Sequence, residues 1–219
     1  MSSAERPEPA KMTILGLTGS IGMGKSTTAQ MFRDQGIPVH DADATVHALY
    51  SGKAGPLIEA RFPGTLKNGT VDRVELAKQA LVDPQALKDL ESIIHPLIRE
   101  DELEFLELNR QNGCDLVILD NPLLFETGSA GRADLVLVVT ASSEEQKRRV
   151  MARPGMTEEK FEKLLSRQIP DSEKRRRADF IIDTGHGLDA ARARVGEIID
   201  TIRSGELRSK KSRELNHRA

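Results

Sequence analysis

The sequence predicts an α/β protein with a parallel sheet, and three features support this class. Five short apolar runs recur along the chain, at residues 13–17, 37–39, 115–120, 135–139 and 180–182. The runs are nearly continuous rather than alternating, which is typical of strands buried on both faces of a parallel sheet. Helical patterns separate them, and a glycine-rich segment directly follows the first. Ligands of such sheets bind beyond the carboxyl ends of the strands, so we expect the functional side chains there.

The glycine-rich segment fits the phosphate-binding P-loop pattern of Gly, four residues, and Gly-Lys-Ser. It consists of Gly19, Ser20, Ile21, Gly22, Met23, Gly24, Lys25 and Ser26, and Thr27 follows it. Glycines let the backbone wrap an anion, and amide N–H groups with the following helix N-terminus then face the phosphate. We expect Lys25 to reach the β- and γ-phosphates and Ser26 to ligate Mg²⁺. A chance glycine-rich turn is the alternative, which the strand before and the helix after disfavour.

An acidic pair, Asp41 and Asp43, follows the second apolar run. Asp43 either caps a helix over residues 44–50 or has a functional role. Asp41 has no comparable local role in the sequence pattern, so we expect it to act in the chemistry.

Residues 51–112 read as a helical insertion between strands, with an irregular, glycine- and proline-rich opening. Helices are expected over 73–81, 84–94 and 96–109, the last with proline in its first turn. Asp101 interrupts the apolar face of the last helix. It is either the partner of a basic group, a substrate contact, or a residue at the partly exposed edge of that apolar face. His95 either caps that helix or touches substrate.

The third apolar run ends in Asp120, which is the layout of a strand whose aspartate holds Mg²⁺ directly or through water. The pattern is weak alone but gains weight beside a P-loop. Further on, Ser143 is expected to cap a helix, with Gln146 completing a capping box. Gln146, Arg149 and Arg153 then share one helix face. Arg149, Arg153 and the later Arg167 are candidate phosphate ligands, with a solvated helix face as the alternative.

Composition restricts the function classes. The 219 residues carry a formal net charge of -2, so bulk charge does not indicate a polyanion-binding protein. The single cysteine, Cys114, allows no internal disulfide and fits a reducing compartment. No apolar run approaches the roughly 20 residues that span a membrane, and aromatic residues are too few to supply base-stacking platforms. We therefore expect a cytoplasmic protein without nucleic-acid or membrane partners, with a disordered leader (1–11) and a basic tail (203–219); a nucleic-acid arm is the alternative reading of that tail.

Several motifs taken together resemble one family. They are Leu17-Thr18 with the P-loop, Asp41-Ala42-Asp43, His95-Pro96, Asp120, Pro122-Leu123-Leu124-Phe125-Glu126, Gln146-Lys147-Arg148-Arg149 with Arg153, Arg167-Gln168 and Ala178-Asp179. Over about residues 12–202 the chain resembles the dephospho-coenzyme A kinases. The P-loop indicates only a nucleotide, whereas Asp-Ala-Asp and Pro-Leu-Leu-Phe-Glu are more specific. The family usually has Asn where this chain has Thr184, which puts an adenine contact by that side chain in question.

The resemblance implies a three-layer P-loop nucleoside-triphosphate hydrolase or nucleotide-kinase fold. Its five-stranded parallel sheet would have the order 2-3-1-4-5, counted along the chain. The core would comprise 12–50, 113–142 and 178–202, with a coenzyme A-binding helical insertion at 51–112 and a lid at 143–177. The protein would be a monomer or a weak homo-oligomer.

The resemblance also implies the activity, which is ATP-dependent phosphorylation of the ribose 3′-hydroxyl of dephospho-CoA with Mg²⁺ as cofactor. Asp41 would be the general base, and Lys25 and Arg149 would stabilise transition-state charge. Ser26 and Asp120 would hold the metal. The residues implied for ATP are Gly19, Gly22, Met23, Gly24, Lys25, Ser26, Thr27, Arg149 and Arg153. Those implied for the acceptor are Asp41, Asp43, His95, Asp101, Leu123, Phe125 and Arg167.

Two other functions compete with this one. Another small-molecule kinase on the same fold is disfavoured by Asp41-Ala42-Asp43. A GTP-binding switch would normally carry an Asn-Lys-x-Asp motif, and the sequence contains none.

Overall fold

A computed structural model describes residues 12–205, which form two compact units. The larger unit comprises residues 12–39 and 113–205, and the smaller one residues 40–112. The leader and most of the tail expected from the sequence lie outside the described residues. The smaller unit begins at His40, whereas the expected insertion begins at residue 51, because the helix in between packs with the helices that follow it.

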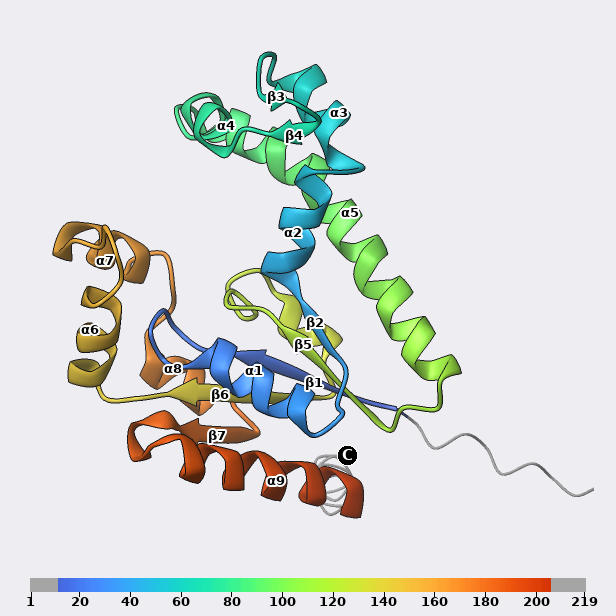
Figure 1. Cartoon of the computed structure of the whole chain (residues 1–219), viewed down its shortest axis with the longest axis vertical. Coiled ribbons are helices and arrows are strands. Elements are labelled where there is room, and N and C mark those ends of the chain that lie inside the picture. The colour runs from blue at the N-terminus through green and yellow to red at the C-terminus, as the bar shows by residue number, and fades with distance from the viewer. Residues whose placement is uncertain (1–11, 206–219) are drawn as a thin grey trace, which may run out of the picture. The chain divides into compact units, whose positions relative to one another are not determined.

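The main sheet has the predicted strand order (Figure 1). Its strands are β1 (Thr13–Thr18), β2 (Val39–Asp41), β5 (Leu116–Asp120), β6 (Leu135–Thr140) and β7 (Phe180–Asp183). They are arranged as β2-β5-β1-β6-β7, which is 2-3-1-4-5 when the five are counted along the chain. This confirms the predicted fold class. The order differs in labels because a separate hairpin, β3 (Leu66–Lys67) and β4 (Thr70–Val71), lies between β2 and β5 in sequence.

The strand register brings the P-loop next to the acidic end of β5. β1 pairs in parallel with β5, so that Leu17 lies opposite Asp120, and with β6, so that Thr18 lies opposite Val138. Because β1 and β5 end together, the loop that leaves β1 starts beside Asp120.

Helices α1 (Lys25–Asp34) and α9 (Leu188–Ser204) cover one face of this sheet (Figure 1). Their apolar residues share a core with the strands, including Phe32, Val195 and Ile198, none of which is exposed. Leu124, Val136 and Val138 form a smaller cluster in the same unit. The remaining elements of the larger unit are η1 (Ser129–Arg132), α6 (Ser143–Met151), α7 (Glu158–Leu165), α8 (Asp171–Arg176) and η2 (Thr184–His186).

The smaller unit has its own apolar core. It is built from α2 (Ala42–Tyr50), α3 (Ala54–Arg61), α4 (Arg73–Ala80), α5 (Pro84–Gln111) and the β3-β4 hairpin. Leu49, Ile58, Phe62, Leu76 and Ile94 are among its buried residues.

The local structure differs from the sequence analysis at three places. The two helices expected over 84–94 and 96–109 form one helix, α5, that runs through Pro96. The lost backbone hydrogen bond is tolerated because Ile94 and Leu97, on either side of the proline, pack into the same core. The hairpin was missed although Asn68-Gly69, with both φ angles positive, is a common two-residue hairpin turn. Helix α9 continues to Ser204, past the expected start of the tail.

Among the described residues, no helix is both long and apolar enough to cross a membrane.

Candidate functional site

The P-loop requires glycine at positions where a side chain would collide with its surroundings. Gly22 and Gly24 adopt left-handed backbone conformations, with φ of 80° and 93°. A Cβ on Gly22 would lie 2.5 Å from Val150 Cγ2, and one on Gly19 would lie 2.7 Å from the Val139 carbonyl oxygen. The loop therefore packs directly against α6 and β6, and its own backbone is left to face an anion.

Lys25 and Asp120 form the central ion pair of the site. Lys25 Nζ lies 2.6 Å from Asp120 Oδ1, and the Asp120 side chain is 1% exposed. Ser26 and Thr27 are exposed on the first turn of α1. The described residues contain no group of three or more His, Cys, Asp or Glu side chains that could hold a metal. The donors present are a hydroxyl and one buried carboxylate, which fits Mg²⁺ held mainly by substrate phosphates.

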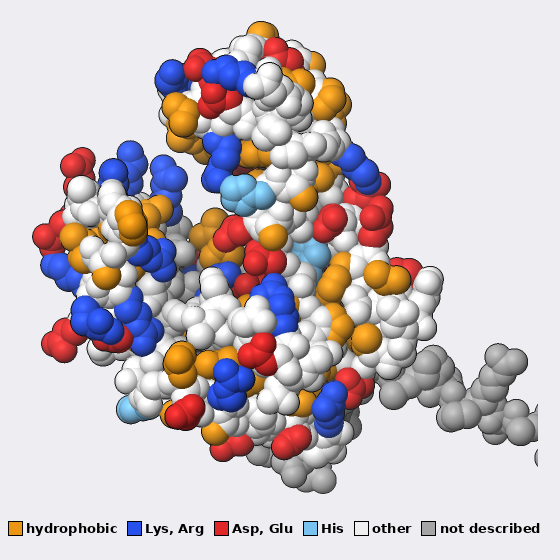
Figure 2. All heavy atoms as spheres, in the orientation of Figure 1, with side chains coloured by type: hydrophobic (Ala, Val, Ile, Leu, Met, Phe, Trp, Pro, Cys, Tyr) orange, Lys and Arg blue, Asp and Glu red, His pale blue; other side chains and the backbone are white. Residues whose placement is uncertain are grey.

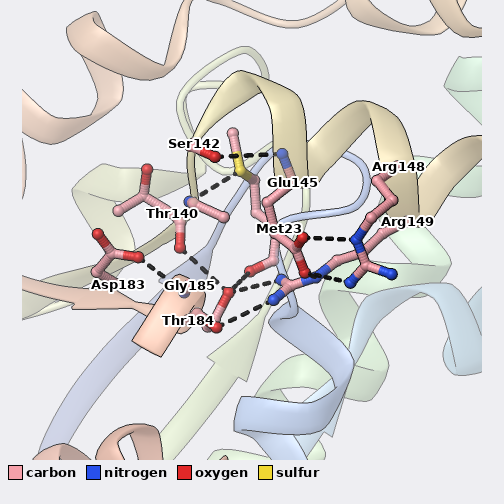
Figure 3. Close-up of polar contacts among 10 residues, drawn as sticks. Met23, Thr140, Ser142, Glu145, Arg148, Arg149, Asp183, Thr184 and Gly185 are labelled. Carbon is pink, nitrogen blue, oxygen red and sulfur yellow. Dashed lines mark hydrogen bonds and ion pairs between the residues drawn. The ribbon is translucent and has the colours of Figure 1, made fainter. Parts of the chain in front are cut away.

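Arg149 is held by Thr184, a residue that the sequence analysis did not assign to the site (Figure 3). Its two terminal nitrogens donate to Thr184 Oγ1 at 2.7 Å and to the Thr184 carbonyl at 3.0 Å. The Thr184 hydroxyl lies 2.9 Å from the Met23 carbonyl oxygen and 3.2 Å from that of Thr140. Thr184 thus connects the arginine on α6, the P-loop and the end of β6. The sequence signal was its position directly after the last strand, next to a glycine-rich turn.

Glu145 completes the support of Arg149. It accepts hydrogen bonds from Arg148 and from Arg149 Nε, and these arginines lower its pKa from 4.5 to about 2. The predicted capping box was wrong by one residue. The helix cap is Ser142, which accepts from the Glu145 amide, and the next residue, Gln146, is buried and faces the P-loop instead.

A cavity of about 320 Å³ lies beside the P-loop, entirely within the larger unit. Its lining combines P-loop glycines, the first turns of α1, an arginine of α6, an arginine just after that helix and the start of α9. These include Gly24, Thr27, Thr28, Arg149, Arg153 and Leu188. The structure therefore brings Arg149, Arg153 and the P-loop together, as the sequence predicted.

The loop after β5 contains the other predicted residues of this unit. Leu123 is exposed and Phe125 is half-buried, with the Arg177 guanidinium 5.7 Å from the centre of its ring. Arg167 is exposed just after α7. Figure 2 shows Lys and Arg side chains gathered over α6 and α7, with Asp and Glu side chains among them.

In the smaller unit, Asp41 has a local structural role that the sequence analysis missed. It is the N-cap of α2, and its Oδ1 accepts the Asp43 and Ala44 amides at 3.0 Å each. The statement that Asp41 has no local role was therefore wrong, and the helix cap that the sequence analysis left open for Asp43 is supplied by Asp41. Asp43 is exposed in the first turn of α2.

Asp101 and His95, both on α5, have different surroundings. Asp101 Oδ2 lies 2.8 Å from His40 Nε2 and accepts from Thr45 Oγ1 at 3.0 Å, so Asp101 is the partner of a basic group. His95 is exposed within α5 and cannot cap it, because the helix is continuous there.

The fold and the site together define a P-loop protein of the nucleotide-kinase class. A glycine-rich loop ends in a lysine paired with a buried aspartate, and Arg149 of α6 and Arg153 just after it line the cavity beside that loop. Comparisons with known proteins then give the family. The family model described as dephospho-CoA kinase matches residues 13–189, and the chain belongs to this family.

Curated relatives and solved structures agree with that assignment. A dephospho-CoA kinase of Mesorhizobium japonicum is 62% identical over 192 residues, covering 88% of this chain and 98% of the relative. That of Rhizobium etli is 54% identical, covering 88% and 95%. A Thermus thermophilus structure matches with a TM-score of 0.76 at 38% identity, covering 86% and 96%. The dephospho-CoA kinase from Campylobacter jejuni matches with a TM-score of 0.60 at 27% identity, covering 87% and 97%.

Proposed function

We propose that this protein transfers the γ-phosphoryl group of ATP to the ribose 3′-hydroxyl of dephospho-CoA, giving CoA and ADP in the last step of coenzyme A biosynthesis. The observation that carries the proposal is the family match over residues 13–189, which contains the P-loop and its Lys25–Asp120 pair. Phosphoryl transfer requires alignment and charge neutralisation more than covalent help from the protein.

The triphosphate would bind at the P-loop. Backbone N–H groups of the loop and Lys25 would hold the β- and γ-phosphates, and Arg149 of α6 and Arg153 just after it would approach them from the cavity side. The adenosine part would enter the cavity beside the loop, since that cavity is continuous with Gly24 and has Leu188 as an apolar wall. Ser26 and Asp120 would hold Mg²⁺, which supplies positive charge to the phosphates when bound.

The acceptor residues are proposals from the sequence and from their chemistry. Asp41 would accept the proton of the 3′-hydroxyl, supported by its carboxylate and its position as the last residue of β2. Asp43, His95, Asp101, Leu123, Phe125 and Arg167 remain the candidate acceptor contacts. For Asp101, the His40 and Thr45 contacts also support a purely structural role. Residues 51–112 are proposed to bind coenzyme A.

Three further predictions from the sequence remain proposals. The segment 143–177 would act as a lid, the protein would be a monomer or a weak homo-oligomer, and it would work in the cytoplasm.

The test is incubation with MgATP and a panel of acceptors, followed by identification of the phosphorylated product by mass. We expect dephospho-CoA to be the preferred acceptor. Faster phosphorylation of AMP, CMP or shikimate would refute the assignment. The same panel is also run with GTP in place of ATP to test the GTP-switch alternative. A kinase of this class gives phosphorylated acceptor in an amount that matches the nucleotide consumed, whereas a switch would hydrolyse GTP slowly without phosphorylating an acceptor.

A further inference from the structure

The backbone of Ile21, in the first half of the P-loop, is bound on both sides by glutamine side chains. Gln146 Nε2 donates to the Ile21 carbonyl oxygen at 2.7 Å. The Ile21 amide donates to Gln168 Oε1 at 3.1 Å. The two glutamines come from opposite ends of one helical segment, since Gln146 lies in α6 and Gln168 follows α7.

The chemistry of the two contacts is opposite. The Ile21 N–H can only donate, so position 168 must present an acceptor. The Ile21 carbonyl can only accept, so position 146 must present a donor. The backbone therefore fixes which way each amide side chain points, and it predicts different tolerance to glutamate at the two positions.

Both glutamines are themselves held in place. Gln146 is 6% exposed, and its helix packs against the loop so closely that Gly22 has no room for a Cβ. Next to Gln168, the Ile169 amide donates to Glu126 Oε1 at 2.9 Å. That oxygen also lies 2.9 Å from Nζ of Lys174, a side chain with no exposed surface. An ion pair between Glu126, in the loop after β5, and the buried Lys174 of α8 thus anchors the chain next to Gln168.

We propose that Gln146 and Gln168 are positioning residues that set the P-loop backbone at Ile21. They would thereby couple the phosphate site to the segment 146–168, which carries the basic residues Arg149, Arg153 and Arg167. Neither glutamine would touch the reacting atoms. Displacing the loop by about 1 Å would misalign the phosphates, and errors of that size cost on the order of 100-fold in rate. The consequence for turnover rests on the proposed function, whereas the consequence for the loop does not.

The first experiment measures amide hydrogen exchange at Ile21 by NMR, without nucleotide. Gln168→Met keeps the length of the side chain and removes the acceptor, so exchange at Ile21 should become at least about tenfold faster. Gln168→Glu restores an acceptor and should recover most of the protection. Unchanged exchange in the methionine variant would overturn the proposal.

The second experiment compares Gln146→Met and Gln146→Glu with the same two changes at position 168, and with Gln30→Met as a control on the exposed face of α1. Affinity for a non-hydrolysable ATP analogue and steady-state constants are measured at a temperature where every variant is folded. Gln146→Glu should be the most damaging, because a carboxylate would face the Ile21 carbonyl. For Gln146→Glu we expect a tenfold or larger loss of kcat/KM for ATP, with less than a threefold change in KM for the acceptor.

Two outcomes would contradict the positioning role. One is equal behaviour of the glutamate variants at positions 146 and 168. The other is a loss of activity that merely follows the folded fraction. If the unaltered protein failed to phosphorylate dephospho-CoA, the proposed function would fall. The exchange and analogue-affinity measurements would still decide the role of the two glutamines.

Discussion

Replacing Asp41 separates two roles that this carboxylate combines. Its Oδ1 caps α2 by accepting two amides at 3.0 Å each, and its proposed chemical role is to accept the proton of the acceptor hydroxyl. Asparagine and serine are good N-caps but poor bases, whereas alanine supplies neither function. The series Asp41→Asn, Asp41→Ser and Asp41→Ala therefore removes first the base and then the cap.

The expected magnitudes of the two losses differ enough to be distinguished. Losing the cap costs about 1 kcal/mol of stability, which lowers Tm by roughly 2–4 °C in a chain of this size. Losing a general base lowers turnover by roughly 10²–10⁴-fold, or about 2.7–5.4 kcal/mol of transition-state stabilisation. Asp41→Asn and Asp41→Ser should therefore melt close to the unaltered protein and turn over at least about 100-fold more slowly. Only Asp41→Ala should show both losses.

The control is Asp72, which caps α4 in the same way by accepting the Val74 and Glu75 amides. Asp72→Ala should lower Tm and leave the turnover of the folded protein unchanged. Turnover, ATP affinity and Tm are measured for each variant across a Mg²⁺ series. Recovery of the asparagine variant at high Mg²⁺ would reassign Asp41 to organising the metal. Near-normal turnover of that variant at ordinary Mg²⁺ would remove Asp41 from the mechanism.

Four further predictions follow from contacts in the larger unit. Lys25→Ala should lower turnover by at least about 100-fold. It should also lower Tm, because the buried carboxylate of Asp120 loses the positive charge beside it. The double variant with Asp120→Asn should recover Tm but not turnover. Thr184→Val should lower kcat/KM for ATP about tenfold, because Arg149 loses an acceptor, and Thr184→Ser should recover it; equal valine and serine variants would contradict this. Lys174→Met should cost about 3 kcal/mol in chemical denaturation, because Glu126, whose side chain is only 13% exposed, loses its counter-charge. The pKa of Glu145 is lowered to about 2, so the stabilisation by its carboxylate should be complete above pH 4.5 and disappear as the pH falls towards 2. The difference in Tm between the unaltered protein and Glu145→Gln should therefore shrink only between pH 4.5 and about pH 2.

The sheet and the P-loop were predictable from the sequence because both depend on local pattern. Strands buried on both faces must be apolar throughout, and four of the five predicted runs form strands of the main sheet; the second, predicted over 37–39, shares only Val39 with the observed strand β2. The loop needs glycine where Cβ atoms would collide and where φ is positive, so its spacing is visible in the sequence. The position of Asp120 at the same edge of the sheet as the P-loop was also predictable, because its strand ends there, but its ion pair with Lys25 was not predicted.

Where two local rules predict different structures for the same residues, the sequence did not show which one the folded chain follows. Ser142 or Ser143, and Asp41 or Asp43, can each begin a helix, and only the final packing selected Ser142 and Asp41. Pro96 predicts a helix boundary, but burial of the apolar residues on both sides of it outweighs one lost hydrogen bond.

By itself, the sequence determined the fold class, the phosphate-binding loop and the family, since each depends on residues that are close together in the chain or on motifs in fixed order. Only the tertiary structure showed what holds the loop and its arginine, namely Thr184 at Arg149 and the glutamines 146 and 168 at Ile21. These contacts join residues more than 30 positions apart, and a threonine or glutamine has no distinctive pattern in sequence. Their roles come from which backbone groups the folded chain leaves to be satisfied beside them.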